Sequence, residues 1–251
     1  YLESLARNTF VSISVDTGNK ETYKRLKGKD RFDQVIQNMG TLVDYSKINN
    51  TLLADRNSAP GVAYNFLIHP LNVGEVVQAT ALAKNIGCNN IHIRPVCVPW
   101  FELGKEESPH SFKPEHVEEF NRQIVEAMKL EDERFKVYGV THKYNPDFSI
   151  THQFESCYAI FMNGVIMPPS DRNKGKGKID WGTCCDRRGD DLVTVRNLTG
   201  LEQIREFWGS PAHWKMHDDI KVKYCPRCTF EPHNRIQENV VLRNGMNYDF
   251  I

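Results

Sequence analysis

The sequence lacks an excess of charge of either sign, and this absence excludes partners that bulk electrostatics would select. It has 32 Lys and Arg against 32 Asp and Glu in 251 residues, so its formal net charge is +0. No overall field recruits nucleic acid or an anionic membrane. No apolar run approaches the roughly 20 residues that a bilayer-spanning helix needs, and the opening residues YLESLARNTF lack the pattern of a secretory signal. We therefore expect a cytoplasmic protein with neither a nucleic-acid nor a membrane partner.

A complete disulfide framework is also missing, because the cysteines are odd in number and unevenly placed. Two of the seven, Cys88 and Cys97, stand alone. The other five crowd the last two fifths of the chain: Cys157, Cys184, Cys185, Cys225 and Cys228. This clustering favours reduced thiolates that bind a metal or an iron-sulfur cluster.

Strand and helix patterns alternate through the first 150 residues. Apolar runs predict strands at 10–16, 62–68, 90–96 and 135–140, and amphipathic stretches predict helices at 32–45, 73–86 and 114–130. Asn72 is a suitable N-cap for the second of these helices, and Gly87 ends it. The alternation predicts a parallel α/β sheet with right-handed crossovers. In such sheets the carboxyl ends of the strands face the ligand, and these ends carry Ser14, Asp16, His69 and Arg94.

The alternation stops near Ile150, which predicts a domain boundary between residues 1–150 and 151–251. In CYAIFMNGVIMPP, Asn163 and Gly164 lie between two apolar runs, a pattern that predicts a β-hairpin. Residues 192–197 predict a further strand, and residues 199–208 and 232–242 predict helices.

The spacing of the late cysteines predicts a site with four thiolates. Cys225 and Cys228 form a C-x2-C motif, which lets two thiolates bind one centre. Cys157 opens the predicted hairpin, and a returning strand would bring Cys184 or Cys185 near it. Adjacent residues rarely bind one centre together, so the other member of that pair is expected to be a packed thiol.

Two other interpretations of these cysteines remain open. Free cysteines are often buried as small hydrophobic residues. Alternatively, His213 and His217 could join Cys225 and Cys228 in a structural zinc site, as the staple of a non-catalytic α/β binding module. Against the zinc site, the two histidines lie beside Trp214 on a predicted helix, where histidines usually pack or cap.

Taken in order, these segments resemble one family, the radical S-adenosylmethionine (radical SAM) enzymes with a C-terminal auxiliary-cluster domain of the SPASM or smaller twitch type. SISVDTGNKETYKRLKG resembles the fourth barrel strand and its helix, NFLIHPLNVGEVVQATALAKNIG the fifth, and NIHIRPV the sixth. CYAIFMNGVIMPP, GTCCD, RNLTGLEQIREFW, CPRC and HNRIQENVV then follow in the order of the auxiliary domain. The resemblance implies an α/β fold, the C-terminal half of a partial (β/α)6 TIM-like barrel, followed by a small α+β twitch-like or SPASM-like domain that binds a cluster. The number of cysteines fits the one-cluster twitch arrangement better.

The sequence departs from this family in one respect. The CxxxCxxC loop that holds the SAM-cleaving 4Fe-4S cluster is absent, and no cysteine precedes Cys88. We expect that loop, its cluster and three strand-helix units to lie upstream of Tyr1. The chain alone is therefore expected to be unable to cleave SAM.

The resemblance implies roles for several residues of the barrel half. Ser14, with Asp16 two residues on, matches the polar position that binds the SAM ribose. Lys27, or Arg25 beside it, matches the basic position that pairs with the SAM carboxylate, and Arg94 matches a position beside the adenine. These residues also have ordinary interpretations. Ser14 could be a small inward-facing residue, and Lys27 and Arg25 could be solvated charges. Arg94 could form an ion pair.

The resemblance also implies an activity. A 5'-deoxyadenosyl radical made from SAM would abstract hydrogen from a small-molecule or peptide substrate, and an auxiliary 4Fe-4S cluster would relay the electron. The ligands of that cluster would be Cys157, Cys184 or Cys185, Cys225 and Cys228. An electron donor such as flavodoxin or ferredoxin is expected, and Asp186 could face the substrate.

Overall fold

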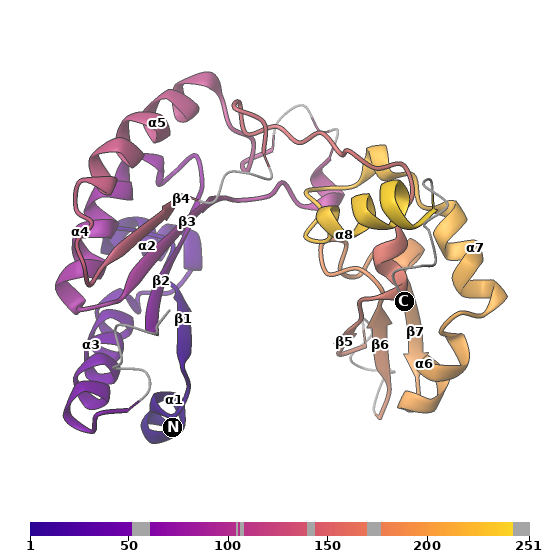
Figure 1. Cartoon of the computed structure of the whole chain (residues 1–251), viewed down its shortest axis with the longest axis horizontal. Coiled ribbons are helices and arrows are strands. Elements are labelled where there is room, and N and C mark those ends of the chain that lie inside the picture. Colours follow the sequence, from indigo (N-terminus) through magenta and orange to yellow (C-terminus); the bar gives the residue numbers. More distant parts are fainter. Residues whose placement is uncertain (52–60, 104, 106–107, 140–143, 170–176, 243–251) are drawn as a thin grey trace. The chain divides into compact units, whose positions relative to one another are not determined.

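The computed structural model describes residues 1–51, 61–103, 105, 108–139, 144–169 and 177–242. The chain forms two compact units (Figure 1). The first comprises Tyr1–Val96 and Pro109–Ser149, and the second comprises Cys97–Ser108 and Ile150–Ile251. Among the residues described, no helix combines the length and the apolar character that a bilayer crossing requires.

In the described part of the first unit, a parallel sheet runs in the order β1-β2-β3-β4. Its strands are β1 (Phe10–Ser14), β2 (Gly61–Ile68), β3 (Asn90–Pro95) and β4 (Lys136–Gly139). The helices are α1 (Leu2–Ala6), α2 (Lys20–Lys27), α3 (Phe32–Ile48), α4 (Val76–Ile86) and α5 (Pro114–Met128). The prediction of a parallel α/β unit is confirmed, and each predicted strand and helix of this half is present within a few residues of its expected bounds.

The two faces of this sheet differ in chemistry, because successive side chains of a strand point to opposite sides. One face carries Tyr64, Phe66 and Ile93, all fully buried in a core to which α3, α4 and α5 contribute. Figure 1 shows these three helices on one side of the strands. The other face carries polar side chains that are exposed or half-buried: Ser12, Ser14, Asn65, His92, Arg94 and Tyr138. An open polar face is therefore available to a ligand.

The carboxyl ends of β1 and β2 are joined by a buried side chain, that of Asn72. Its Nδ2 donates to the carbonyls of Asp16 (2.6 Å) and Leu67 (2.9 Å), and its Oδ1 accepts from His69 N (2.6 Å). The prediction that Asn72 caps the following helix is wrong, since α4 begins only after a short 3-10 turn and Asn72 makes no capping bond. Asn72 thus supplies a hydrogen-bond donor to the carbonyl of Asp16, just beyond β1, and to the carbonyl of Leu67, near the end of β2.

In the described part of the second unit, β5 (Val165–Met167), β6 (Ile179–Gly182) and β7 (Thr194–Leu198) form an antiparallel sheet. The helices are α6 (Leu201–Phe207), α7 (Pro211–Asp219) and α8 (Glu231–Ile236), and α8 continues as a π-helix over Gln237–Leu242. The strand predicted at 192–197 and the two predicted helices are confirmed.

The hairpin predicted at Asn163-Gly164 is wrong. The apolar run before it forms a 3-10 helix, Tyr158–Phe161, while β5 after it pairs with β6. Gly164 serves a different purpose, because a Cβ atom there would lie only 2.5 Å from Nε1 of the buried Trp181. The glycine permits a close approach to an indole ring rather than a two-residue turn.

Candidate functional site

Four cysteines of the second unit converge on one small hydrophobic core. Cys157, Cys184, Cys225 and Cys228 all pack against it, and its buried members are Phe154, Ile160, Val193, Ile220 and Val222. Every cysteine of the chain is a free thiol. The four predicted site cysteines are thus brought together from three separate parts of the sequence.

Different local structures present these thiols. Cys157 directly precedes the 3-10 helix Tyr158–Phe161, and Cys184 follows β6. Cys225 ends a second 3-10 turn, where its N–H bonds the carbonyl of Val222 at 2.8 Å. Cys228 lies three residues before α8. Loops and helix ends surround the site, so backbone N–H groups are available to the sulfurs.

Each of the four sulfurs has hydrogen-bond donors nearby. Nη1 of Arg187 lies 3.6 Å from Cys225 Sγ, and Nδ2 of Asn234 lies 3.7 Å from Cys228 Sγ. Backbone groups of Ile160 and Ala159 bond Cys157, and those of Asp186 and Arg187 bond Cys184. Donors aimed at sulfur stabilise thiolate charge and are typical of thiolate-ligated centres.

Without a cationic centre, these thiols stay protonated. Burial, reinforced by the neighbouring Cys225, raises the pKa of Cys157 to about 11, and burial raises the pKa of Cys184 to about 12. Burial likewise raises the pKa of Cys228, and Cys157 and Cys184 add to that rise. The thiols therefore lie close enough to interact, and the core needs a positive group to hold them as thiolates.

The donor set consists of four thiols with hydrogen-bond donors at their sulfurs, and four thiolates are the ligands that a four-iron cluster uses. Among the described residues, no three His, Cys, Asp or Glu side chains are arranged to hold one metal ion. A zinc ion would draw its thiolates into one tetrahedral shell at about 2.3 Å. A four-iron cluster instead takes one thiolate on each iron, so its ligands lie farther apart. The four free thiols around this core can supply those four ligands.

The histidines of the alternative zinc site belong to a cluster of aromatic rings. His213 is fully buried on α7, and its Nδ1 accepts from Gly209 N at 3.1 Å. Its ring packs against Phe161, Trp181, Phe207 and Trp208. The ring of His217 lies 5.0 Å from that of Tyr158, centroid to centroid, and its Nδ1 is 2.9 Å from Asp218. These contacts account for the ring packing and for Nδ1 of each histidine, whereas Nε2 of His217 is buried and makes no hydrogen bond to the described residues.

The remaining cysteines fall outside the four-thiol core. Cys185 bonds the Thr229 side chain and is not a member of the core, so Cys184 is the member of the pair that joins it. Cys88 is buried in the first unit. Cys97 contacts the C-x2-C turn, where its Sγ accepts from Arg227 N at 3.2 Å. Sequence reasoning left Cys97 isolated, because 130 positions separate it from Arg227.

The turn that carries Cys225 and Cys228 is held by Asp186. Its carboxylate accepts from Thr229 N (2.6 Å) and from Thr229 Oγ1 (2.9 Å). The suggestion that Asp186 faces a substrate therefore gives way to a structural role, since both of its oxygens are engaged by Thr229.

Two buried polar residues near the C-terminal end of the described chain hold the Cys157 segment. The Glu238 carboxylate accepts from the backbone N–H groups of Glu155 and Ser156, with each N···O distance at 3.0 Å. Asn234 Oδ1 accepts from Ala159 N at 2.8 Å. Sequence reasoning missed both residues. The one available signal was the presence of a carboxylate and an amide among the apolar positions of a predicted helix.

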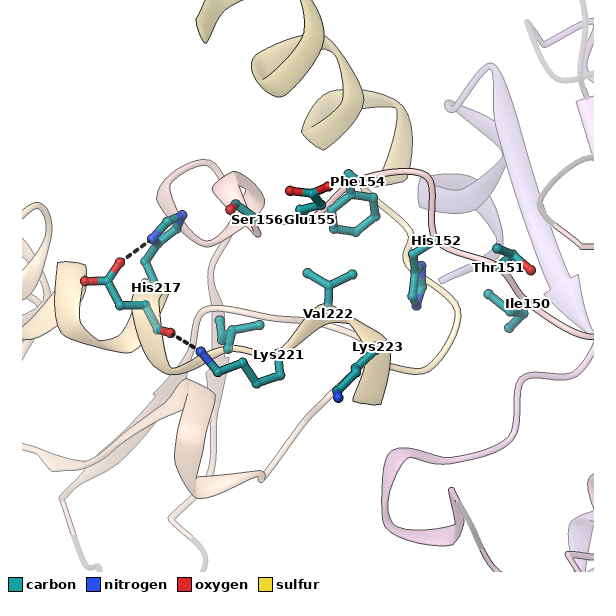
Figure 2. Close-up of a pocket in the computed structure, with 12 residues that line it drawn as sticks. Ile150, Thr151, His152, Phe154, Glu155, Ser156, His217, Lys221, Val222 and Lys223 are labelled. Atoms are coloured by element: carbon teal, nitrogen blue, oxygen red, sulfur yellow. Dashed lines mark hydrogen bonds and ion pairs between the residues drawn. The ribbon is translucent and has the colours of Figure 1, made fainter. Parts of the chain in front are cut away.

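A cavity of about 660 Å³ (Figure 2) shares part of its apolar wall with the core against which the four thiols pack. Its apolar lining includes Phe154, Ile220 and Val222, and the same three side chains belong to the core against which the cysteines pack. His152, which also lines the cavity, places Nε2 at 3.2 Å from the Cys225 carbonyl. One apolar layer is thus shared by the cavity and the thiols.

In the first unit, the predicted SAM-binding residues do not all remain available. Asp16 is buried, its Oδ1 accepts from Leu67 N at 2.9 Å, and its other oxygen forms an ion pair with Lys27. Ser14 and Arg94 are exposed at the ends of β1 and β3, on the open polar face. Arg25 is exposed on α2. Ser14 and Arg94 can therefore reach a ligand, whereas Asp16 is engaged within the protein.

His69, directly after β2, is uncharged at neutral pH. Burial, followed by the neighbouring His110 and His116, lowers the pKa of His69 to about 4. Its Nδ1 accepts a hydrogen bond from Leu71 N at 3.1 Å, which requires an unprotonated Nδ1. The strand ends thus present a neutral imidazole rather than a cation.

Comparisons with known proteins agree with part of this picture. No family model matches the chain. Over 93 residues, 37% of this chain, it is 28% identical to proteins described as "probable GTP 3',8-cyclase" from several strains of Saccharolobus islandicus. Over 83 residues it is 26% identical to a protein of the same description from Saccharolobus solfataricus. These matches cover only 26% and 23% of the length of the relatives.

The similarity supports the radical SAM family. It is distant, and it concerns about a quarter of the relatives' length. It does not bear on the auxiliary-cluster domain that the sequence predicts.

Proposed function

We propose that the chain is part of a radical SAM oxidoreductase. The first unit is the C-terminal half of a partial (β/α)6 barrel, and the second is a twitch-like domain that binds one auxiliary 4Fe-4S cluster. When bound, such a cluster supplies a one-electron acceptor or relay. The protein's own residues supply its ligands, their hydrogen bonds and an apolar enclosure.

The observation that carries the proposal is the convergence of four free thiols on one core. Cys157, Cys184, Cys225 and Cys228 come from segments far apart in the sequence, yet each lies on the same hydrophobic cluster and has hydrogen-bond donors at its sulfur. A purely structural core gains little from four half-buried thiols with hydrogen-bond donors aimed at them. An iron-sulfur cluster requires that arrangement.

The open face of the first unit supports the SAM part of the proposal. Ser14, at the end of β1, offers a hydroxyl to the SAM ribose. The exposed Arg94 lies at the end of β3, which β2 separates from β1 in the sheet. Lys27 offers its charge to the SAM carboxylate, and its ion pair with Asp16 orients the ammonium group. Asp16 thus positions Lys27 and holds β2 through Leu67 N, instead of contacting the ribose itself.

The reaction in the complete enzyme is a two-electron oxidation of an alcohol or of a peptide side chain. The auxiliary cluster, which Cys157, Cys184, Cys225 and Cys228 would hold, would accept the one electron that the substrate radical gives up together with a proton. The partners we propose are a small-molecule or peptide substrate and an electron donor such as flavodoxin or ferredoxin, in the cytoplasm.

Anaerobic reconstitution with iron and sulfide, with zinc in competition, tests the cluster. The chain is expected to bind about four irons and four sulfides and to show the broad visible absorption of an iron-sulfur cluster. The Cys225→Ala, Cys228→Ala double variant should lose both. Cys184→Ala should also lose loading, whereas the adjacent Cys185→Ala serves as the matched control and should retain it.

Binding of one zinc ion per chain and of no sulfide would contradict the proposed redox role. That outcome would favour the alternative of a non-catalytic binding module that a structural zinc site stabilises. Equal loss of iron in Cys184→Ala and Cys185→Ala would contradict the assignment of Cys184 alone as the ligand.

A further inference from the structure

A buried ion pair touches one of the four thiols. Arg187 Nε donates to Asp190 Oδ2 at 2.6 Å, a second guanidinium nitrogen also pairs with that carboxylate, and Nη1 lies 3.6 Å from Cys225 Sγ. The side chains of Arg187 and Asp190 are each only 11% exposed. A guanidinium placed against sulfur in a water-poor site acts more strongly on the charge of that sulfur than a solvated cation would.

The backbone fixes this pair in place. Asp190 N bonds the Arg187 carbonyl at 3.1 Å, and Gly189, at φ 78°, allows the intervening turn. Asp190 Oδ1 accepts from Leu192 N at 3.0 Å, which orients the carboxylate toward Arg187. The geometry is therefore built by the chain and does not depend on a flexible surface contact.

The neighbouring arginine has no such role. Arg188 carries the same charge one position later, but it is exposed, and its carbonyl accepts from Trp100 Nε1 at 3.2 Å. The two residues differ mainly in burial and in contact with a cluster ligand. They form a natural matched pair for experiment.

We propose that Arg187 is a positioning residue that raises the reduction potential of the auxiliary cluster through Cys225, and that Asp190 limits this rise. The proposal rests on the proposed function, because it assumes a cluster bound by the four thiols. On reduction the cluster gains one electron, and the added negative charge spreads over its sulfurs. An N–H bond and a positive charge at Cys225 stabilise that reduced state, whereas the Asp190 carboxylate opposes it.

This tuning suits a cluster that accepts electrons. A substrate radical that loses one electron and one proton delivers the electron to the cluster, and a higher potential makes this transfer more favourable. Arg187 thus favours oxidation of the substrate over return of the electron to the substrate radical.

The test is a redox titration of the reconstituted chain with dithionite, followed by electron paramagnetic resonance of the reduced cluster. Arg187→Gln should lower the equilibrium constant for reduction about tenfold, which is a shift of about 59 mV for a one-electron couple. Asp190→Asn should shift the potential in the opposite direction. Arg188→Gln, with the same change in net charge as Arg187→Gln, should shift it far less.

Each outcome is decisive. A wild-type chain that binds no iron and sulfide overturns the proposed function, and this proposal with it. A loaded cluster with equal potentials in wild type and Arg187→Gln overturns the proposal alone, as do equal shifts in Arg187→Gln and Arg188→Gln. If Arg187→Gln fails to fold, Asp190→Asn decides. An unchanged or lower reduction potential in Asp190→Asn overturns the proposal.

Discussion

Glu238 is the residue whose replacement tests most directly how the second unit holds its Cys157 segment. Its buried carboxylate accepts from two backbone N–H groups, those of Glu155 and Ser156. A hydrogen bond to a charged group contributes about 1.5–3 kcal/mol. Glu155 is exposed, so water can replace its bond in part. We therefore expect Glu238→Ala to lower the free energy of unfolding of this unit by about 3 kcal/mol.

Tryptophan fluorescence isolates the relevant transition. The four tryptophans of the chain, Trp100, Trp181, Trp208 and Trp214, all belong to the second unit. With a urea dependence of about 2 kcal/mol per molar, the loss corresponds to a midpoint lowered by about 1.5 M. Glu238→Gln keeps one acceptor oxygen and should fall about halfway between wild type and Glu238→Ala.

An exposed glutamate provides the control. Glu202 is 78% exposed and pairs with Arg205 on the surface of α6, so Glu202→Ala should change the free energy of unfolding by less than about 0.5 kcal/mol. A Glu238→Ala midpoint equal to that of Glu202→Ala would refute the reasoning. Reduced cluster loading in Glu238→Ala would show in addition that Cys157 depends on this anchor.

Three further predictions concern single contacts. Asn72→Ala removes three hydrogen bonds of a buried side chain at about 1 kcal/mol each, so amide exchange at the ends of β1 and β2 should accelerate about a hundredfold, as measured by mass spectrometry. Unchanged amide exchange at these strand ends would contradict the role of Asn72 in joining them. Gly164→Ala places a methyl group against Trp181 and should lower the free energy of unfolding of the second unit by about 1–3 kcal/mol in urea titrations. An unaltered midpoint would mean that the ring moves aside. His69 should titrate near pH 4 by NMR, and because its folded-state pKa is lowered, its contribution to stability is complete above about pH 6.5 and declines as the pH falls toward 4. An NMR titration midpoint near pH 6.5 would contradict the effect of burial on His69.

Local sequence patterns were sufficient for most of the secondary structure. The strands at 62–68 and 90–96 and the helix at 114–130 lie close to β2, β3 and α5, because periodicity reports which face of an element is buried. The parallel arrangement followed from their alternation. The Asn163-Gly164 pattern gave a wrong prediction of a hairpin, because a glycine that suits a tight turn also suits a close approach to Trp181.

The sequence by itself determined the α/β character of the first unit and the supply of thiols in the second. Only the tertiary structure decided which groups meet: Arg187 with Cys225 across 38 positions, and Glu238 with Glu155 across 83. It also decided that Asp16 pairs with Lys27 and holds β2. Periodicity depends on near neighbours along the chain, whereas these contacts depend on how distant segments pack, and no local pattern encodes that packing.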